Sequence, residues 1–101
     1  ILDIERVKAI RKAMPAESRV VMHGGSGVDE KQVQAAITAG CSKVNYYSYM
    51  AKACTKHMQE YLNKIEGNGF WHEVDEEAYR FMKEYAKDVL RVFKNGKTCK
   101  L

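Results

Sequence analysis

Long apolar runs, targeting patterns and proline are what this sequence lacks. It contains no run of 18 apolar residues and opens with no signal-peptide pattern, so it offers no hydrophobic membrane-spanning helix. Pro15 is the only proline, and no internal repeat or low-complexity segment appears. We therefore expect a globular chain without a membrane partner.

Cysteine is also scarce. The three cysteines, Cys41, Cys54 and Cys99, are odd in number and far apart, and no Cys-x-x-Cys pair occurs. This pattern argues against a disulfide framework and is typical of free thiols in a reducing compartment. We expect a cytoplasmic location.

The excess of positive charge is small and spread along the chain. Seventeen Lys and Arg against 13 Asp and Glu give a formal net charge of +4 and a pI of about 9.0, which alone would fit polyanion binding. Acidic residues at 75–77 are however followed by bases at 80, 83 and 87, which is the pattern of a solvated helix face. The one basic cluster, Lys94, Lys97 and Lys100, is more typical of a frayed tail. We expect no nucleic-acid partner.

Apolar periodicity predicts four helices, over about 3–14, 30–39, 49–65 and 76–93. The first should end before Pro15, and Asp75 is the expected N-cap of the last. Short, β-branched runs near Val20 and Val44 predict two strands. The segment 66–72 should be a loop that its aromatic residues hold down.

The most informative segment is His23-Gly24-Gly25-Ser26-Gly27, which follows the apolar run Val20-Val21-Met22. Its glycines allow positive φ angles and close approach to a ligand, and Asp29-Glu30 opens a helix just beyond. Such a loop can turn several N–H groups toward an anion with the helix dipole behind them, and the imidazole is a possible metal ligand. Taken alone, the motif equally fits a strand-to-helix turn with a buried histidine.

A second motif follows 22 residues after His23. Asn45 lies in Ser42-Lys43-Val44-Asn45-Tyr46-Tyr47-Ser48, which reads as a second strand, and the amphipathic helix between the motifs ends at Gly40. A strand-helix-strand crossover makes the strands parallel, so their carboxyl ends open on the same side of the sheet. We expect His23 and Asn45 to face one site. The start of the next helix, at Ser48, should join Ser26 around one phosphate.

In this order and spacing, the two motifs resemble those of the class II, metal-dependent ketose-bisphosphate aldolases, such as fructose-bisphosphate or tagatose-bisphosphate aldolase. The resemblance covers most of the chain and rests on His-Gly-Gly-Ser-Gly, a short helix ending in glycine, and Lys-Val-Asn-x-x-Ser. It implies an α/β fold, in which this chain is the carboxyl-terminal fragment of a (β/α)8 TIM barrel of about 250 residues or more. The fragment would hold two parallel strands and about four helices, with residues 1–101 belonging to a single barrel domain.

The resemblance also implies an activity in carbohydrate metabolism, including glycolysis. Members of the family are lyases that reversibly cleave a ketose bisphosphate to dihydroxyacetone phosphate and an aldehyde, with Zn2+ or another divalent metal as Lewis acid. By this resemblance, His23 is one of about three zinc-ligating histidines. Gly24 and Ser26 bind the phosphate of the ketose or of dihydroxyacetone phosphate, and Ser48 completes the phosphate site. Asn45 contacts the bound triose.

Two features set this chain apart from the family's pattern. Tyr46 and Tyr47 stand where the family has small or acidic residues, a difference that bears on substrate choice. The chain is also short and begins at Ile1 without Met, which fits an excised segment. No catalytic acid or base is identified in it, so the fragment alone should be inactive. Its open strand edges and uncovered helix faces predict a homo-oligomer.

Other readings of the same residues remain open. A non-catalytic phosphate-binding or assembly domain would keep the loop and lack the metal. An α/β-hydrolase piece would also contain His-Gly-Gly, but no Gly-x-Ser-x-Gly follows here. His57 is a candidate ligand by residue type only, against a packed or surface histidine. His72 with its acidic neighbours is either a metal site or a surface loop beside a helix N-cap.

Overall fold

The computed structural model describes residues 1–97 and contains four helices and two parallel strands, as the sequence predicts. The described residues form two compact units, one of residues 1–46 with 90–97 and one of residues 47–89. Cys99 and Lys100 lie outside the described residues. Within residues 1–97, no helix is both long and apolar enough to cross a membrane.

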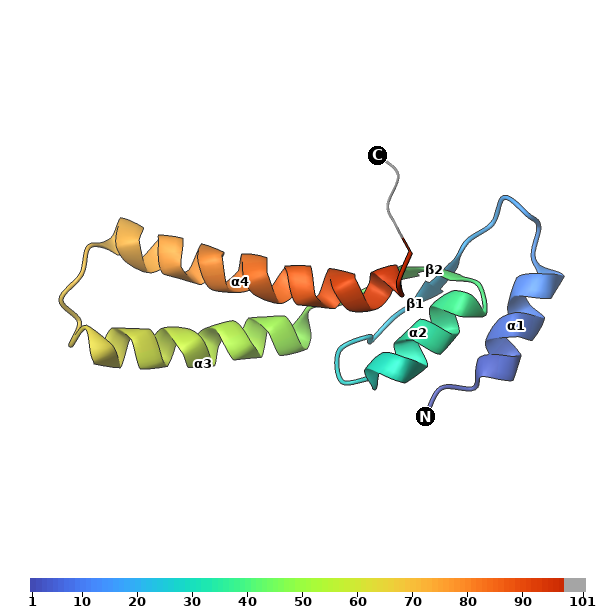
Figure 1. Cartoon of the computed structure of the whole chain (residues 1–101), viewed down its shortest axis with the longest axis horizontal. Helices are drawn as coiled ribbons and strands as arrows, with labels where there is room; N and C mark the ends of the chain where they lie inside the picture. The colour runs from blue at the N-terminus through green and yellow to red at the C-terminus, as the bar shows by residue number, and fades with distance from the viewer. Residues whose placement is uncertain (98–101) are drawn as a thin grey trace. The chain divides into compact units, whose positions relative to one another are not determined.

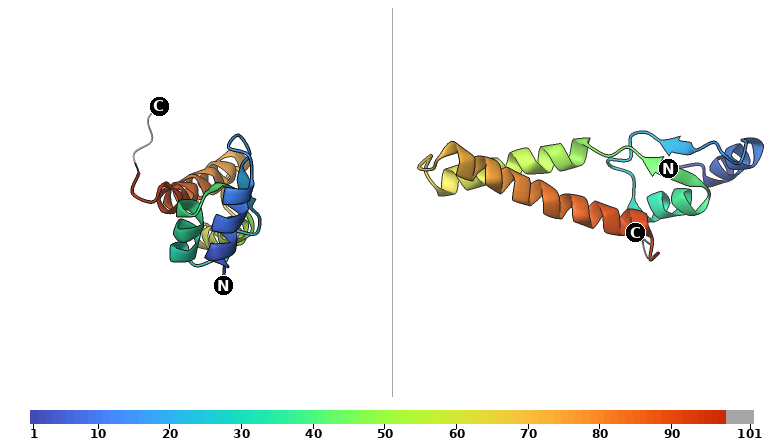
Figure 2. Two further views of the ribbon diagram at one scale, coloured as in Figure 1. Left: turned by 90° about the vertical axis from the view of Figure 1, so that its right-hand side faces the viewer. Right: turned by 90° about the horizontal axis from the view of Figure 1, so that it is seen from above.

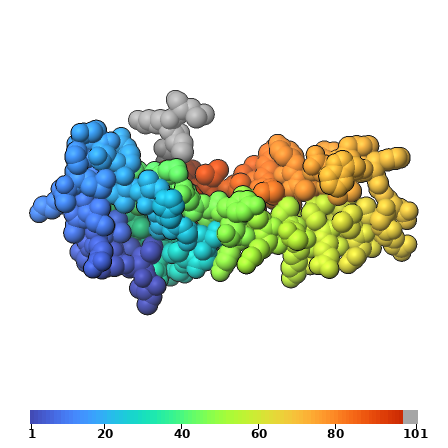
Figure 3. All heavy atoms as spheres, turned by 180° about the vertical axis from the view of Figure 1, so that it is seen from behind, coloured from blue at the N-terminus to red at the C-terminus, as the bar shows by residue number. Residues whose placement is uncertain are grey.

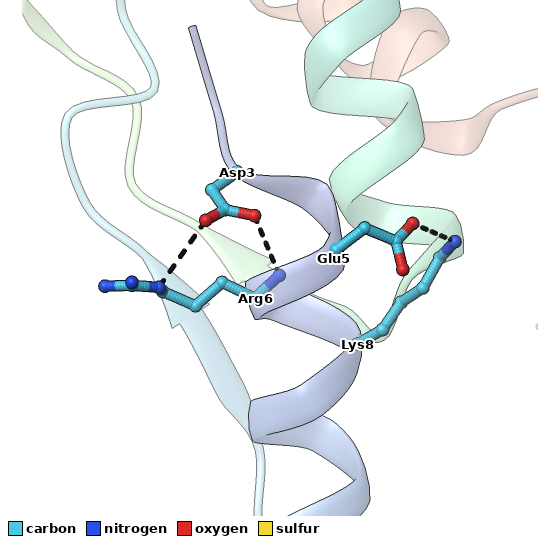
Figure 4. A network of polar contacts seen from close by, with 4 residues as sticks. All are labelled: Asp3, Glu5, Arg6 and Lys8. Atoms are coloured by element: carbon cyan, nitrogen blue, oxygen red, sulfur yellow. Dashed lines mark hydrogen bonds and ion pairs between the residues drawn. The ribbon is translucent and has the colours of Figure 1, made fainter.

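Helix α1, Ile4–Ala13, opens the first unit. The Asp3 carboxylate accepts the Arg6 backbone N–H at 2.9 Å and so caps the helix. Two exposed ion pairs, Asp3 with Arg6 and Glu5 with Lys8, run along its first turns (Figure 4). The helix ends as predicted before Pro15, which disfavours helical geometry in the preceding residue.

The strands and the helix between them form the predicted crossover. Strand β1, Val20–Met22, pairs in parallel with strand β2, Cys41–Val44, and α2, Glu30–Thr38, connects them. Val33 and Ala36 on α2 are 3% and 1% exposed, and Cys41 is buried with them. Helices α1 and α2 lie side by side next to the strands (Figures 1 and 2). This small core sets the position of both strand ends.

Helix α4 spans Trp71–Lys94, and its last residues, from 90 onward, belong to the first unit. Gln34 of α2 donates its side-chain N–H to the Val92 carbonyl at 3.3 Å, and Asn95 donates to the Thr38 hydroxyl at 3.1 Å. The ring of Tyr46, just after β2, meets that of Phe93 edge-on, with centroids 6.1 Å apart. The last turn of α4 is therefore held by side chains from α2 and from the end of β2.

The second unit is a helical hairpin of α3, Ser48–Lys64, and the greater part of α4. The two helices run in opposite directions (Figure 1), and the loop that joins them lies at the end of the hairpin (Figure 3). His57 of α3 contacts two side chains of α4: its Nε2 lies 2.8 Å from Glu77 Oε1, and its ring stacks on Phe81 at 4.3 Å. An apolar groove of about 620 Å3 is lined by Cys54, Met58, Leu62, Met82 and neighbouring side chains.

Two expectations about the hairpin are wrong. Helix α4 begins at Trp71 rather than at 76, so Asp75 lies inside it. The carboxylate of Glu73 accepts the Phe70 backbone N–H at 3.0 Å, which is one half of a capping box and starts the helix early. The aromatic residues do not hold the loop down either, because Phe70 and Trp71 are 72% and 78% exposed.

Candidate functional site

The carboxyl ends of β1 and β2 are joined by backbone hydrogen bonds that continue beyond the strands. The Asn45 N–H donates to the Met22 carbonyl at 2.9 Å, and the Gly25 N–H donates to the Asn45 carbonyl at 3.1 Å. The residues that follow β1 are thereby held beside those that follow β2. The crossover predicted from the sequence accounts for this arrangement, since parallel strands end at the same edge.

Gly25 is required at this edge because the two chains approach so closely. A Cβ atom at this position would lie 2.7 Å from Val44 Cγ1 and 3.0 Å from the Asn45 carbonyl oxygen. Gly24 needs its freedom for another reason, since its φ of +67° lies in the left-handed region. The two glycines thus serve different purposes, close packing at Gly25 and a left-handed backbone conformation at Gly24.

The side chains of His23 and Asn45 meet at this edge. His23 Nδ1 lies 3.0 Å from Asn45 Nδ2, with His23 exposed and Asn45 half-buried. The predicted proximity of these two residues is confirmed. Their chemical roles stay predictions.

Lys43 is a third member of this group, and the sequence reasoning missed it. Its ammonium donates to Asn45 Oδ1 at 2.5 Å. Lys43 and Asn45 are two residues apart in an extended segment, so their side chains leave the backbone on the same face. The spacing of two residues could have predicted this contact. A lysine at the end of a strand is, however, usually expected to point into solvent.

The start of α2 differs from the expected anion site. The Asp29 carboxylate accepts the backbone N–H groups of Lys31 and Gln32 at 3.0 and 3.3 Å. Because this carboxylate already occupies the positive end of the helix dipole, the dipole does not stand open behind the loop. The Val28 N–H is also used, by the Gly25 carbonyl at 3.4 Å. The N–H groups of Val28, Lys31 and Gln32 are thus engaged within the chain.

Ser48 is the first residue of α3, where the sequence predicted a helix start. It belongs to the hairpin unit, whereas Gly24, Ser26 and Asn45 belong to the first unit. The N-cap of α3 is Tyr47, whose side chain makes no capping hydrogen bond and is exposed. The two tyrosines therefore differ, since the ring of Tyr46 packs edge-on against Phe93.

The described residues do not make a complete metal site. Within residues 1–97, no three side chains of His, Cys, Asp or Glu come together to hold an ion. His57 is engaged by Glu77 and Phe81, and the ring of His72 stacks on Phe70 at 5.8 Å. A zinc centre takes about three or four protein ligands, so the one imidazole at the strand edge does not suffice.

The chain matches the model of the family described as fructose-bisphosphate aldolase class-II over residues 1–98. A fructose-bisphosphate aldolase of Streptococcus pneumoniae is 33% identical over 67 residues, which cover 66% of this chain and 22% of that protein. A fructose-bisphosphate aldolase of Mycoplasma pneumoniae is 39% identical over 61 residues, which cover 60% of this chain and 20% of that protein. The chain thus spans about a fifth of the length of these curated relatives.

A solved structure shows the same fold. The crystal structure of the YdjI aldolase from Escherichia coli K12 superposes with a TM-score of 0.80 at 23% identity, covering 99% of this chain and 36% of that one. At this identity the likeness concerns the fold alone. The family match extends over nearly all of the sequence and includes both motifs at the strand edge. This chain belongs to the family of class II fructose-bisphosphate aldolases.

Proposed function

We propose that this chain is the carboxyl-terminal part of a (β/α)8 barrel enzyme, a zinc-dependent aldolase that reversibly cleaves a ketose bisphosphate to dihydroxyacetone phosphate and an aldehyde. Family membership over residues 1–98 supports the reaction class, and the length of the relatives supports a longer parent protein. The observation that carries the proposal is the meeting of His23 and Asn45 at the carboxyl ends of parallel strands. Barrel enzymes build their active sites at that end of the sheet.

His23 supplies one metal ligand in this proposal, and the remaining ligands come from other parts of the parent protein. Asn45 binds the triose beside it. No group suited to proton transfer is assigned among the described residues, so the isolated chain is inactive. Zinc should bind the isolated chain only weakly, because a single imidazole lacks the other ligands of a closed site. Nanomolar zinc affinity of the chain alone would contradict this assignment.

The phosphate of the ketose or of dihydroxyacetone phosphate is bound by Gly24 and Ser26 of the loop. The glycine-rich backbone supports this role, because it allows close approach to an anion. Ser48 contributes through its hydroxyl or its backbone N–H, and the lack of a capping side chain at the start of α3 favours an anion there. The part of Ser48 rests on the family motif.

The parent protein is further proposed to be a cytoplasmic homo-oligomer. The hairpin supports the homo-oligomer, because Tyr79 and Leu62 are 62% and 40% exposed and leave apolar surface uncovered. Sedimentation of the parent protein at micromolar concentration tests the oligomer. A monomer would reject it.

A matched pair of histidine variants tests the proposed reaction in the full-length parent. His23→Ala should lower the rate of dihydroxyacetone phosphate release from a ketose bisphosphate by about a hundredfold or more, and should weaken zinc binding. His72→Ala, at an exposed histidine of the hairpin, should change the rate less than about twofold. Full activity of His23→Ala would reject the role of His23. Phosphate binding without any cleavage by the wild type would instead indicate a non-catalytic phosphate-binding domain.

A further inference from the structure

The dipeptide Asn-Gly occurs twice in the chain, at Asn68-Gly69 and at Asn95-Gly96. Glycine carries no side chain, so the backbone nitrogen that follows each asparagine can approach the asparagine amide closely. The first pair lies in the loop between α3 and α4, and the second lies directly after α4. Because the two pairs belong to different units, the same chemical group stands in two different surroundings.

The surroundings of Asn68 leave its amide mobile. Asn68 and Gly69 are exposed, and the Asn68 side chain forms no hydrogen bond within residues 1–97. The Asn68 backbone N–H donates to the Ile65 carbonyl at 2.8 Å, which holds the chain before the asparagine but not the rotation about its own Cα–C bond. The amide carbon of Asn68 can therefore turn toward the Gly69 nitrogen.

Asn95 is held at several points. Its φ of +50° places it in the left-handed region, and its backbone N–H donates to the Val92 carbonyl at 3.1 Å. The side-chain Nδ2 donates to the Thr38 hydroxyl at 3.1 Å, and the residue is half-buried. The Lys97 N–H closes the turn by donating to the Lys94 carbonyl at 3.0 Å. The amide carbon of Asn95 reaches the next backbone nitrogen only if this turn first opens.

We propose that Asn68, in preference to Asn95, is a site of spontaneous covalent modification. The Gly69 nitrogen loses its proton to solvent base and attacks Asn68 Cγ. A new C–N bond forms, and the bond from Cγ to Nδ2 breaks with release of ammonia. Water then opens the resulting succinimide ring at either carbonyl, which gives aspartate or isoaspartate. Water is the only co-reactant, and the proposal does not depend on the proposed aldolase function.

The modification changes the hairpin at its turn. Asn68 lines a hollow of about 360 Å3 that is also lined by three carboxylates, those of Glu73, Glu76 and Glu77. The neutral amide thus becomes a further negative charge in an acidic place. An isoaspartate also adds a carbon atom to the main chain between α3 and α4. Both changes fall within the hairpin unit and leave the strand edge as it is.

Peptide mapping by mass spectrometry measures the conversion of both asparagines in one sample. The full-length parent is incubated at mildly alkaline pH, and a protein-isoaspartate methyltransferase marks the isoaspartyl product. In the folded protein, Asn68 should convert about tenfold faster than Asn95 or more, because reaction at Asn95 requires the turn to open. In concentrated urea, which removes this protection, the two sites should convert at rates within about threefold of each other.

Two variants separate the causes. Gly69→Ala should slow the conversion of Asn68 about tenfold, because the added Cβ hinders the attacking nitrogen. Gly69→Ser takes its place if the alanine variant fails to fold. Thr38→Val removes the acceptor of the Asn95 side-chain bond and should speed the conversion of Asn95 about threefold, while Asn68 keeps its wild-type rate.

Equal rates at the two sites of the folded protein would overturn the proposal. A preference for Asn68 that persisted in urea would also overturn it, since the difference would then lie in the neighbouring residues and not in the fold. An unchanged rate at Asn68 in a folded Gly69 variant would reject the attack by the Gly69 nitrogen.

Discussion

The strand-helix-strand region and the helical hairpin are held together by different forces. In the first, backbone hydrogen bonds join the strands and their ends, and Val33, Ala36 and Cys41 are buried. In the hairpin, Cys54 is the one buried residue among those described, and His57 of α3 contacts Glu77 and Phe81 of α4. Backbone hydrogen bonds between β1 and β2 are enough to fix the positions of the two strand ends. The hairpin has no such backbone pairing, and large apolar side chains such as Tyr79 and Leu62 are exposed on it.

The largest difference between the regions should appear when a methyl group is added to a glycine in each. Gly25→Ala places its Cβ 2.7 Å from Val44 Cγ1 and 3.0 Å from a backbone oxygen, so the strand ends must separate. We expect a loss of about 1–3 kcal/mol in the free energy of unfolding of the parent. In Gly69→Ala, the near atom is Ile65 Cδ1 at 2.9 Å, the end of a flexible side chain, and the cost should be below about 0.5 kcal/mol. Equal shifts in urea unfolding would contradict this account.

A smaller effect is expected from the cap of α2. Asp29→Ala removes the acceptor of two backbone N–H groups and should cost about 1 kcal/mol. Asp29→Asn keeps a good N-cap side chain and should cost only a few tenths of that. The measurement is urea unfolding of both variants against the wild type. An alanine variant that unfolded at the wild-type midpoint would show that the cap does not stabilise the protein.

The hairpin should respond locally to the loss of His57. His57→Ala removes the contacts to Glu77 and Phe81, but the side chains of His57 and Glu77 are still 32% and 27% exposed, so solvent weakens their interaction. We expect the variant to lose less than about 1 kcal/mol of stability in the hairpin. The loss should be measurable as faster amide hydrogen exchange in α3 and α4. Exchange of the β1 and β2 amides should not change, and Lys56→Ala is the surface control. A global increase in exchange would show that the two regions do not open separately.

The smallest effect is expected at Glu76 on the surface of α4. The hydrogen bond from Arg80 to Glu76 and the charge of Glu76 raise the pKa of Arg80, and the two side chains are 66% and 58% exposed. Because a raised pKa keeps this residue charged throughout the usual range, the pair contributes equally at about pH 5 and at about pH 9. Glu76→Gln should leave the unfolding midpoint unchanged within error at either pH. A measurable, pH-dependent shift would reveal a stronger pair than the exposure allows.

Most of the element order was predictable from the sequence because each local signal agreed with the tertiary structure. The stop before Pro15, the glycine-rich turn after Val20–Met22 and the helix start at Ser48 each follow from backbone preferences of the residues present. The proximity of His23 and Asn45 follows from the parallel crossover alone. Family membership was likewise readable from the two motifs.

The sequence failed where a side chain had two equally plausible uses. Asp75 looked like an N-cap, but Glu73 could start the helix one turn earlier by accepting the Phe70 N–H. Aromatic residues predict burial only if another surface covers them, and Phe70 and Trp71 have none in the described unit. Lys43 escaped notice because its bond to Asn45 depends on both side-chain rotamers, which the sequence does not determine.

Each region contains one buried cysteine, whose rate of alkylation can report the opening of that region. Cys41 belongs to the strand region and Cys54 to the hairpin, and they are 5% and 9% exposed. An alkylating reagent reaches a shielded thiol only when the surrounding structure opens, so its rate of reaction measures that opening. With Cys99 replaced by serine, modification followed by mass spectrometry times the opening of each region in the same sample. The scarcity of cysteine thus leaves one natural reporter in each of the two parts.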